Sequence, residues 1–271
     1  MTNTNQFDQL CSLGNLLSAW MRVEESDGCA GIDGVTLERF ADNLDAELQR
    51  LSSELADGTY RPLPVAQFFV PKRSGGQRRL CVLAVRDRVA QHAVIGVILP
   101  RVEAEFEDVS FAYRRGRSVK QALAEVGRLR EAGYQFLVDA DISSYFENVD
   151  HELLTQRVAA LVEDKGILNL IEQWIGPMVY DGQQMVKSVR GLPQGSPLSP
   201  LLANLFLDAM DDRLLAAGLK MVRFADDFLI LCKSREKAEA AMELVKLTLA
   251  DLRLTLNEEK TRLTDFAQGF T

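Results

Sequence analysis

The chain has 271 residues, of which 47% are hydrophobic and 26% charged, with a formal net charge of −8; this composition predicts a globular protein with one large core or two smaller lobes. No apolar run approaches the roughly 20 residues of a membrane-spanning helix, and the first ten residues lack the pattern of a signal peptide. The four scattered cysteines argue against a disulfide framework or a zinc site and favour a reducing cytoplasm. The two histidines leave little room for triad or zinc-hydrolase chemistry.

The net charge hides a basic segment in the middle of the chain. Residues 1–60 hold three basic and eleven acidic side chains, residues 61–120 hold twelve and five, and residues 121–271 hold sixteen and twenty-three. A phosphate-binding surface requires such a local basic patch. Charge alone fits a solvated face equally well, so this alternative stays open.

Apolar periodicity and turn residues predict the elements of the first half in this order: a helix over 36–57, a hairpin with a basic tip over 67–83, a helix over 86–106 and a helix over 118–133. Thr36 is the expected N-cap of the first helix. Pro100 should bend or end the third element, because proline cannot donate the helical hydrogen bond.

The second half continues with a strand over 134–142, a helix over 151–162 capped by Asp150, a strand from 185 that runs into a Gly/Pro-rich turn, a helix over 201–215, two strands within 220–234, a helix over 235–252 and a closing strand over 254–263. Helices and strands alternate irregularly, and hairpins are prominent. This pattern predicts an α+β fold with a largely antiparallel sheet rather than a doubly wound parallel one.

Two pairs of aspartates interrupt the apolar strands. Asp139 and Asp141 share one face of their strand because strand side chains alternate, and Asp226 with Asp227 lies at the bend between two strands. If the strands are neighbours, Asp141 and Asp226 meet, and both can stay ionised only beside a cation. A pair of magnesium ions on carboxylates performs displacement at phosphorus without histidine. The alternative is that each pair lies in water at a strand end.

Six segments resemble, in the same order, the motifs of bacterial reverse transcriptases of the type encoded by group II introns: 31–40, 70–89, 137–151, 190–208, 222–231 and 256–263. The resemblance runs from about Gly31 over nearly the whole chain. It implies right-hand polymerase fingers and palm, with an N-terminal extension and fingers over 1–135, a basic hairpin over 61–90 and a palm over 136–271. Residues 151–190 are also compatible with packing on the fingers.

The resemblance implies an RNA-directed DNA polymerase that uses two Mg²⁺ ions, or Mn²⁺ in their place. The implied catalytic and metal-binding groups are the carboxylates of Asp141, Asp226 and Asp227 and the carbonyl of Ile142. The implied nucleotide-binding residues are Lys72, Arg78 or Arg79, Phe146, Gln194, Gly195 and Lys260. The implied nucleic-acid-binding residues are Arg73, Arg114, Arg115 and Arg117.

The same resemblance implies substrates and partners. The ring of Phe146 would collide with a 2′-hydroxyl, so the expected substrate is a deoxynucleoside triphosphate, added to a DNA or RNA primer on an RNA template. CRISPR adaptation proteins or a structured host RNA are the expected partners in the CRISPR-associated, antiviral or retron-like branches. The chain stops where relatives continue into a thumb, so we expect low processivity. A second hypothesis is therefore a catalytically weak or inactive polymerase-like module for RNA binding or assembly.

Overall fold

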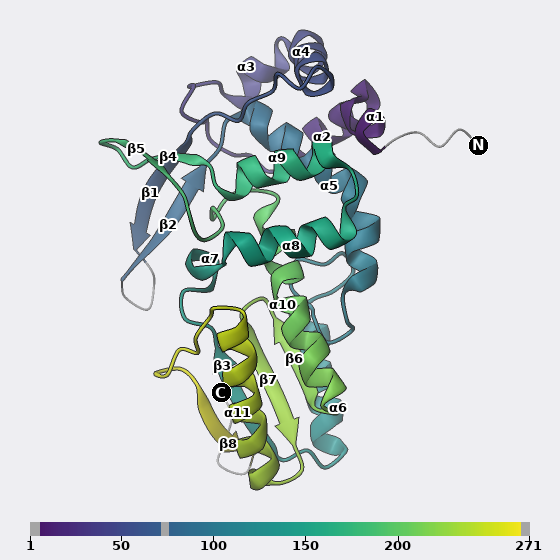
Figure 1. Ribbon diagram of the computed structural model, residues 1–271, viewed down its shortest axis with the longest axis vertical. Coiled ribbons are helices and arrows are strands. Elements are labelled where there is room, and N and C mark those ends of the chain that lie inside the picture. Colours follow the sequence, from purple (N-terminus) through teal and green to yellow (C-terminus); the bar gives the residue numbers. More distant parts are fainter. Residues whose placement is uncertain (1–5, 72–75, 267–271) are drawn as a thin grey trace, which may run out of the picture. The chain divides into compact units, whose positions relative to one another are not determined.

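The computed structural model describes residues 6–71 and 76–266, which form two compact units (Figure 1). The first unit contains the residues up to Val102 together with Thr155–Pro200. The second unit contains Glu103–Leu154 and the chain from Leu201 onward. The boundary between fingers and palm at residue 135 stays a prediction. No helix within the described ranges is both long and apolar enough to cross a bilayer.

The first unit is largely helical. Its helices are α1 (Gln6–Cys11), α2 (Leu13–Glu25), α3 (Leu37–Ala41), α4 (Leu44–Ala56), most of α5 (Val85–Glu105), most of α8 (His151–Leu161) and α9 (Lys165–Ile175). The prediction of one helix over 36–57 is wrong, because Asn43 leaves the helical region at φ −124° and ψ 28° and thereby separates α3 from α4. Thr36 does cap α3, accepting a hydrogen bond from the Arg39 amide at 3.1 Å. Helix α5 continues past Pro100.

A four-stranded sheet of order β2-β1-β4-β5 completes the first unit. Its strands are β1 (Val65–Pro71), β2 (Gln77–Val82), β4 (Met178–Tyr180) and β5 (Met185–Lys187). The antiparallel pairing of β1 with β2 confirms the predicted hairpin. Strand β4, which the sequence did not indicate, joins β1 in parallel. The basic tip of the hairpin, with Lys72 and Arg73, lies outside the described residues.

The second unit is built on an antiparallel sheet of order β6-β7-β3-β8. Its strands are β3 (Phe136–Asp141), β6 (Lys220–Phe224), β7 (Asp227–Cys232) and β8 (Arg262–Asp265). This sheet confirms the predicted α+β class. The closing strand over 254–263 is misplaced in the prediction, because a loop occupies 254–261 and β8 begins only at Arg262.

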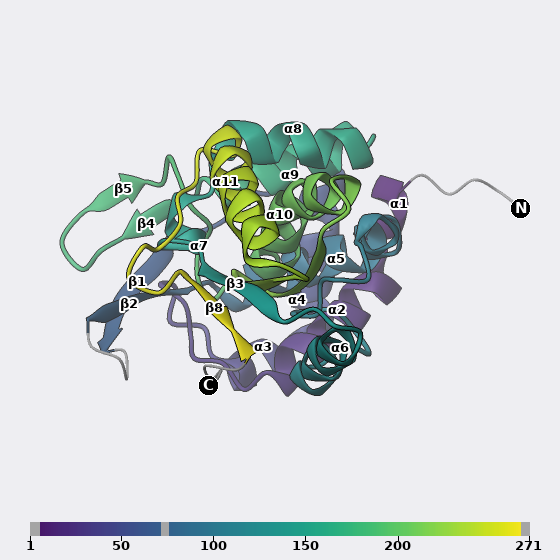
Figure 2. The same cartoon turned by 90° about the horizontal axis from the view of Figure 1, so that it is seen from below.

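Helices cover both faces of this sheet. Helix α6 (Val119–Glu131) packs on a cluster that includes Leu137, Val222 and Leu231, and α11 (Arg235–Asp251) contacts β3 and β7. Figure 2 shows α6 and α11 on opposite sides of the strands. The second unit also contains α7 (Tyr145–Asn148) and most of α10 (Ser199–Ala216). Leu137 and Val138 are fully buried, and Ala140 and Asp141 are buried as well, so β3 is enclosed along most of its length.

Candidate active site

Three aspartates gather at one end of the sheet in the second unit. Strand β3 ends at Asp141 and β7 begins at Asp227, and the register pairs these two residues directly. Phe224 pairs with Asp227, so Ala225 and Asp226 form the two-residue turn between β6 and β7. Directly paired residues place their Cβ atoms about 5 Å apart. The carboxylate opposite Asp141 is therefore that of Asp227, and the approach of Asp226 to Asp141 stays a prediction.

The carboxylates repel one another. Burial raises the pKa of Asp227 to about 6. A hydrogen bond with Asp141 and the negative charges of Asp226 and Asp141 also raise this pKa, whereas the positive charge of Lys260 lowers it. Like charges that share a site disfavour ionisation, and a nearby cation restores it. This end of the sheet is therefore an electrostatically unfavourable place that a cation would stabilise.

Asp141 is held by the loop that follows α11. Its Oδ2 accepts hydrogen bonds from Lys260 Nζ at 2.9 Å and from Asn257 Nδ2 at 3.1 Å, and its carbonyl accepts from the Asn257 amide at 2.8 Å. The hydrogen bond to Asp141 raises the pKa of Lys260 and keeps it protonated. Lys260, expected to bind nucleotide, thus forms an ion pair with Asp141, and its role toward a nucleotide stays a prediction. Asn257 was missed, although it lies inside the motif over 256–263.

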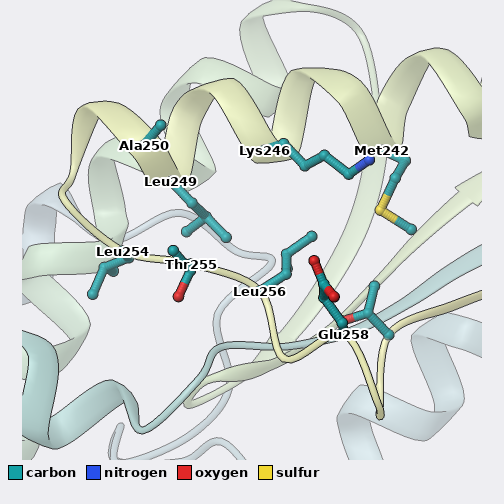
Figure 3. Close-up of a pocket in the computed structure, with 9 residues that line it drawn as sticks. Met242, Lys246, Leu249, Ala250, Leu254, Thr255, Leu256 and Glu258 are labelled. Atoms are coloured by element: carbon teal, nitrogen blue, oxygen red, sulfur yellow. The ribbon is translucent and has the colours of Figure 1, made fainter.

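The same loop forms one wall of a pocket of about 440 Å³ against α11 (Figure 3). The helix contributes Met242, Lys246, Leu249 and Ala250, and the loop contributes Leu254, Thr255, Leu256, Glu258 and Thr261. Leu256 also forms an isolated β-bridge with Ile142, the buried residue after Asp141. The loop thus contacts the pocket on one side and the Asp141–Ile142 segment on the other.

The site can be tested for its fit to a divalent cation. Within residues 6–71 and 76–266, no group of three or more His, Cys, Asp or Glu side chains has the geometry of a metal site. The chemistry of the donors at the sheet end nevertheless fits magnesium, which prefers oxygen ligands and a few carboxylates. The observation that supports the fit is the direct pairing of Asp141 with Asp227, next to the turn that holds Asp226.

Phe146 has a rigid support in the second unit. It lies in α7, just beyond Asp141, and packs edge to face on Tyr145 with ring centroids 5.6 Å apart. The Tyr145 side chain is buried, and its hydroxyl donates to the Ala203 carbonyl at 2.5 Å. A ring supported in this way has little freedom to move, as a steric gate requires.

The turn containing Gln194 and Gly195 is attached to β2 in the first unit. The Gln194 carbonyl accepts a hydrogen bond from the Cys81 amide at 2.7 Å. Gly195 has a φ of 118°, and a Cβ at this residue would lie 2.2 Å from the Cys81 carbonyl oxygen. Only glycine fits this conformation and this approach. The sequence predicted that a glycine here lets the backbone approach another group closely, and the approach of Gly195 to the Cys81 carbonyl agrees with that expectation.

The two candidate arginines of β2 cannot act together on one face. Arg78 and Arg79 are consecutive strand residues, opposite Val70 and Phe69 of β1, so their side chains point to opposite faces of the sheet. Arg78 is exposed and Arg79 is partly buried. Which of them binds nucleotide stays a prediction.

The basic run over 113–117 is less available than its sequence suggests. Arg114 is buried, and its guanidinium donates to the Glu103 carboxylate and to three carbonyl groups, those of Phe106, Glu107 and Ser110. Its expected role in nucleic-acid binding is therefore replaced by a structural one. Arg117 pairs with Asp108, whereas Arg115 is exposed.

Comparison with known proteins agrees with this architecture. A sequence profile of the family described as "Reverse transcriptase (RNA-dependent DNA polymerase)" matches residues 70–268. Protein YkfC of Escherichia coli K12 is 30% identical over 89% of this chain and 73% of its own length. The group II intron-encoded protein LtrA of Lactococcus lactis is 32% identical, over 69% of this chain but only 31% of its own length.

Solved structures share the fold. A chain of a partial Cas6-RT-Cas1–Cas2 complex superposes with a TM-score of 0.56 and 28% identity, over 92% of this chain and 43% of that one. Apo telomerase from Candida tropicalis, at 14% identity, also gives a TM-score of 0.56, over 82% of this chain and 56% of that chain; this likeness concerns the fold alone. The profile match and the similarity to YkfC identify the family of this chain from its sequence. It belongs to the reverse transcriptase family of RNA-dependent DNA polymerases.

Proposed function

We propose that the chain adds deoxynucleotides to a primer 3′-hydroxyl on an RNA template, with two magnesium ions held by Asp141, Asp226 and Asp227. The observation that carries the proposal is the direct pairing of Asp141 with Asp227 at a sheet end whose adjoining turn holds Asp226. Membership of the reverse transcriptase family supports it.

The proposed reaction forms a bond from the primer 3′-oxygen to the α-phosphorus and breaks the bond to pyrophosphate, and the hydroxyl proton is lost. Magnesium at these carboxylates would lower the pKa of the attacking hydroxyl and offset the charge on the leaving oxygen. Lys260 carries its proton at Nζ, 2.9 Å from Oδ2 of Asp141, and holds that carboxylate in place through an ion pair. Phe146 would orient the sugar and exclude a 2′-hydroxyl from its ring edge.

Primer extension on an RNA template tests the proposal. Asp226→Asn and Asp141→Asn should each lower the rate by about 1,000-fold, because losing a metal ligand costs several kcal/mol of transition-state stabilisation. The matched control is Asp139→Asn, which removes a carboxylate from the same strand, where Asp139 lies 3.7 Å from Arg262 rather than beside Asp227. Extension at the wild-type rate by Asp226→Asn would refute the assigned role.

A second candidate is a catalytically weak or inactive polymerase-like module that binds RNA or assembles with a partner. One observation favours it, namely that the Lys260 ammonium pairs with the carboxylate expected to bind metal. The discriminating assay is the magnesium-dependent incorporation of one deoxynucleotide on a preformed primer–template. Tight duplex binding without incorporation would support the module.

The proposal extends to partners and location. Besides RNA template, primer and deoxynucleoside triphosphates, CRISPR adaptation proteins are candidate partners, which the similarity to chains of Cas6-RT-Cas1–Cas2 complexes supports. A structured host RNA is supported by the similarity to an intron-encoded protein. The four unpaired cysteines support a reducing cytoplasm. Co-elution with purified Cas1–Cas2 or with an intron RNA would discriminate between the two partner classes.

A further inference from the structure

Arg223 of β6 is a charged residue with no exposed surface, three positions before Asp226. Its Nε lies 2.8 and 2.9 Å from the two carboxylate oxygens of Asp211, and one terminal nitrogen donates to Asp211 at 2.5 Å. Asp211 lies in α10 and is fully buried as well. Proteins bury an arginine only when its donors are satisfied, and this pair satisfies one side of the guanidinium.

The other side of the guanidinium reaches the catalytic turn. The second terminal nitrogen donates to Asn204 Oδ1 at 3.0 Å and to the Ala225 carbonyl at 3.1 Å. Ala225 has a φ of 61°, a left-handed conformation that is unfavourable for any residue with a side chain. The network therefore connects α10 to a strained peptide directly before Asp226.

Neighbouring contacts fix both ends of this connection. The Arg223 amide donates to the Val109 carbonyl at 2.8 Å, and its carbonyl accepts from the Phe111 amide at 3.0 Å. Asn204 in turn donates its amide to the Ala112 carbonyl at 2.7 Å. With backbone and side-chain groups all bound, the guanidinium has no alternative position, and the Ala225 carbonyl is held against a rigid support.

We propose that Arg223, Asp211 and Asn204 form a positioning network, which fixes the Ala225 peptide and so aims the Asp226 carboxylate at its cation. This inference rests on the proposed function, because it takes Asp226 as a metal ligand. Arg223 acts through the turn, and its role is that of a positioning residue. The competing interpretation is a buried ion pair that only fills the core, in which case the order of the turn would not depend on it.

The central test is the double variant Arg223→Met with Asp211→Leu. Apolar replacement of both partners of a buried ion pair is often neutral for stability, but here it also removes the hydrogen bond to Ala225. The matched control is Leu214→Ala, a fully buried residue of the same helix outside the network, which lowers stability by leaving a cavity. Arg223→Lys is a second variant, since lysine lacks the planar fork needed to reach Asp211 and Ala225 together.

Three measurements separate positioning from core filling. In the double variant, hydrogen exchange of the amides over 224–228 should accelerate about 10-fold through local opening. Mn²⁺ affinity, measured by electron paramagnetic resonance, should fall about 10- to 100-fold. The kcat for single-nucleotide incorporation should fall about 100-fold, with the nucleotide KM nearly unchanged. Leu214→Ala should lower the melting temperature and leave all three values near those of the wild type.

The inference is refuted if the double variant folds and its hydrogen-exchange rates and Mn²⁺ affinity equal those of the wild type. If the double variant does not fold, hydrogen exchange and Mn²⁺ affinity are measured on Arg223→Lys instead. Values equal to those of the wild type in that variant would also refute the inference. Failure of the proposed function has a different signature. The wild type would then bind Mn²⁺ without incorporating nucleotides. Amide hydrogen exchange and Mn²⁺ affinity of the variants would still report the effect of the network on the turn.

Discussion

Replacing Gly195 by alanine should displace the turn that holds Gln194 against β2. The added Cβ would lie 2.2 Å from the Cys81 carbonyl oxygen, in a backbone conformation with φ of 118°. The Cys81 amide also donates to the Gln194 carbonyl at 2.7 Å, so β2 cannot retreat without stretching this hydrogen bond. The substitution therefore combines two costs, an unfavourable backbone conformation and a contact with a fixed carbonyl.

The size of the effect follows from these two costs. A non-glycine residue in a sparsely populated backbone region costs about 1–3 kcal/mol. Relieving the contact requires a shift of about 1 Å, which weakens a hydrogen bond whose net value is about 0.5–1.5 kcal/mol. We expect Gly195→Ala to lower the free energy of unfolding by roughly 2–4 kcal/mol, or the melting temperature by roughly 5–15 °C.

Thermal unfolding compared with a matched glycine tests this reasoning. Gly182 has a φ of 98°, but a Cβ at this residue meets nothing within 4 Å, so Gly182→Ala has the conformational cost without the contact. Gly195→Ala should be the more destabilising by about 1 kcal/mol or more, and only Gly195→Ala should raise the nucleotide KM. Equal melting temperatures for the two variants would show that the turn is not tightly held against β2 in solution.

Three further predictions address charge and substrate choice. Burial, with the charges of Arg22 and Arg88 nearby, lowers the pKa of His92 to about 4, so its contribution to stability is present above the unfolded pKa of about 6.5 and falls by about 2 kcal/mol between pH 7 and pH 5. Asp87 and Asp227, whose pKa values are raised to about 6, act in the opposite direction over this range. The difference in the free energy of unfolding between the wild type and His92→Gln should therefore fall by about 2 kcal/mol between pH 7 and pH 5, and a difference that does not change with pH would contradict this. The side chains of Arg78 and Arg79 occupy opposite faces of β2, so only one of the variants Arg78→Ala and Arg79→Ala should raise the nucleotide KM, by about 10-fold. An equal rise in KM in both variants would contradict this. Phe146→Ala should narrow the preference for deoxynucleotides over ribonucleotides about 10- to 100-fold in kcat/KM, and an unchanged preference would exclude the ring as a gate.

The sheet of the second unit could be predicted because its strands carry strong local signals. Strands β3, β6 and β7 are short apolar runs. Asp150 caps α8, the second helix after β3, and Ser234 caps α11, which follows β7, as expected for such residues. The position of the acidic pairs within those runs indicated that the two motifs would meet if the strands were neighbours, and β3 and β7 are neighbours in the sheet. Register was less accessible: the pairing of β3 with β7 places Asp227 opposite Asp141, and a shift of one residue in that pairing would place Asp226 or Phe228 there instead.

The sequence could not reveal interactions that depend on tertiary partners. Arg114 is an ordinary basic residue in a basic run, and only the fold shows that Glu103 and neighbouring carbonyls use its donors. Arg223 offered a signal that could have been used, because an arginine inside a buried strand requires an acidic partner. Helix α10 carries three aspartates, Asp208, Asp211 and Asp212, and the structure shows that Asp211 is the partner.

The charges around the turn of Ala225 and Asp226 fall into two sets with different consequences. Behind the turn, Arg223 and Asp211 neutralise each other inside the core, so this pair can fix the turn without adding charge to the site. At the sheet end, one ammonium, that of Lys260, faces the carboxylates of Asp141, Asp226 and Asp227, which leaves two negative charges when all three are ionised. These charges balance one divalent cation. A second cation would need further anionic ligands, and magnesium commonly obtains them from substrate phosphates. Under the proposed two-ion mechanism, this charge balance predicts a site that is completed only when the nucleotide binds.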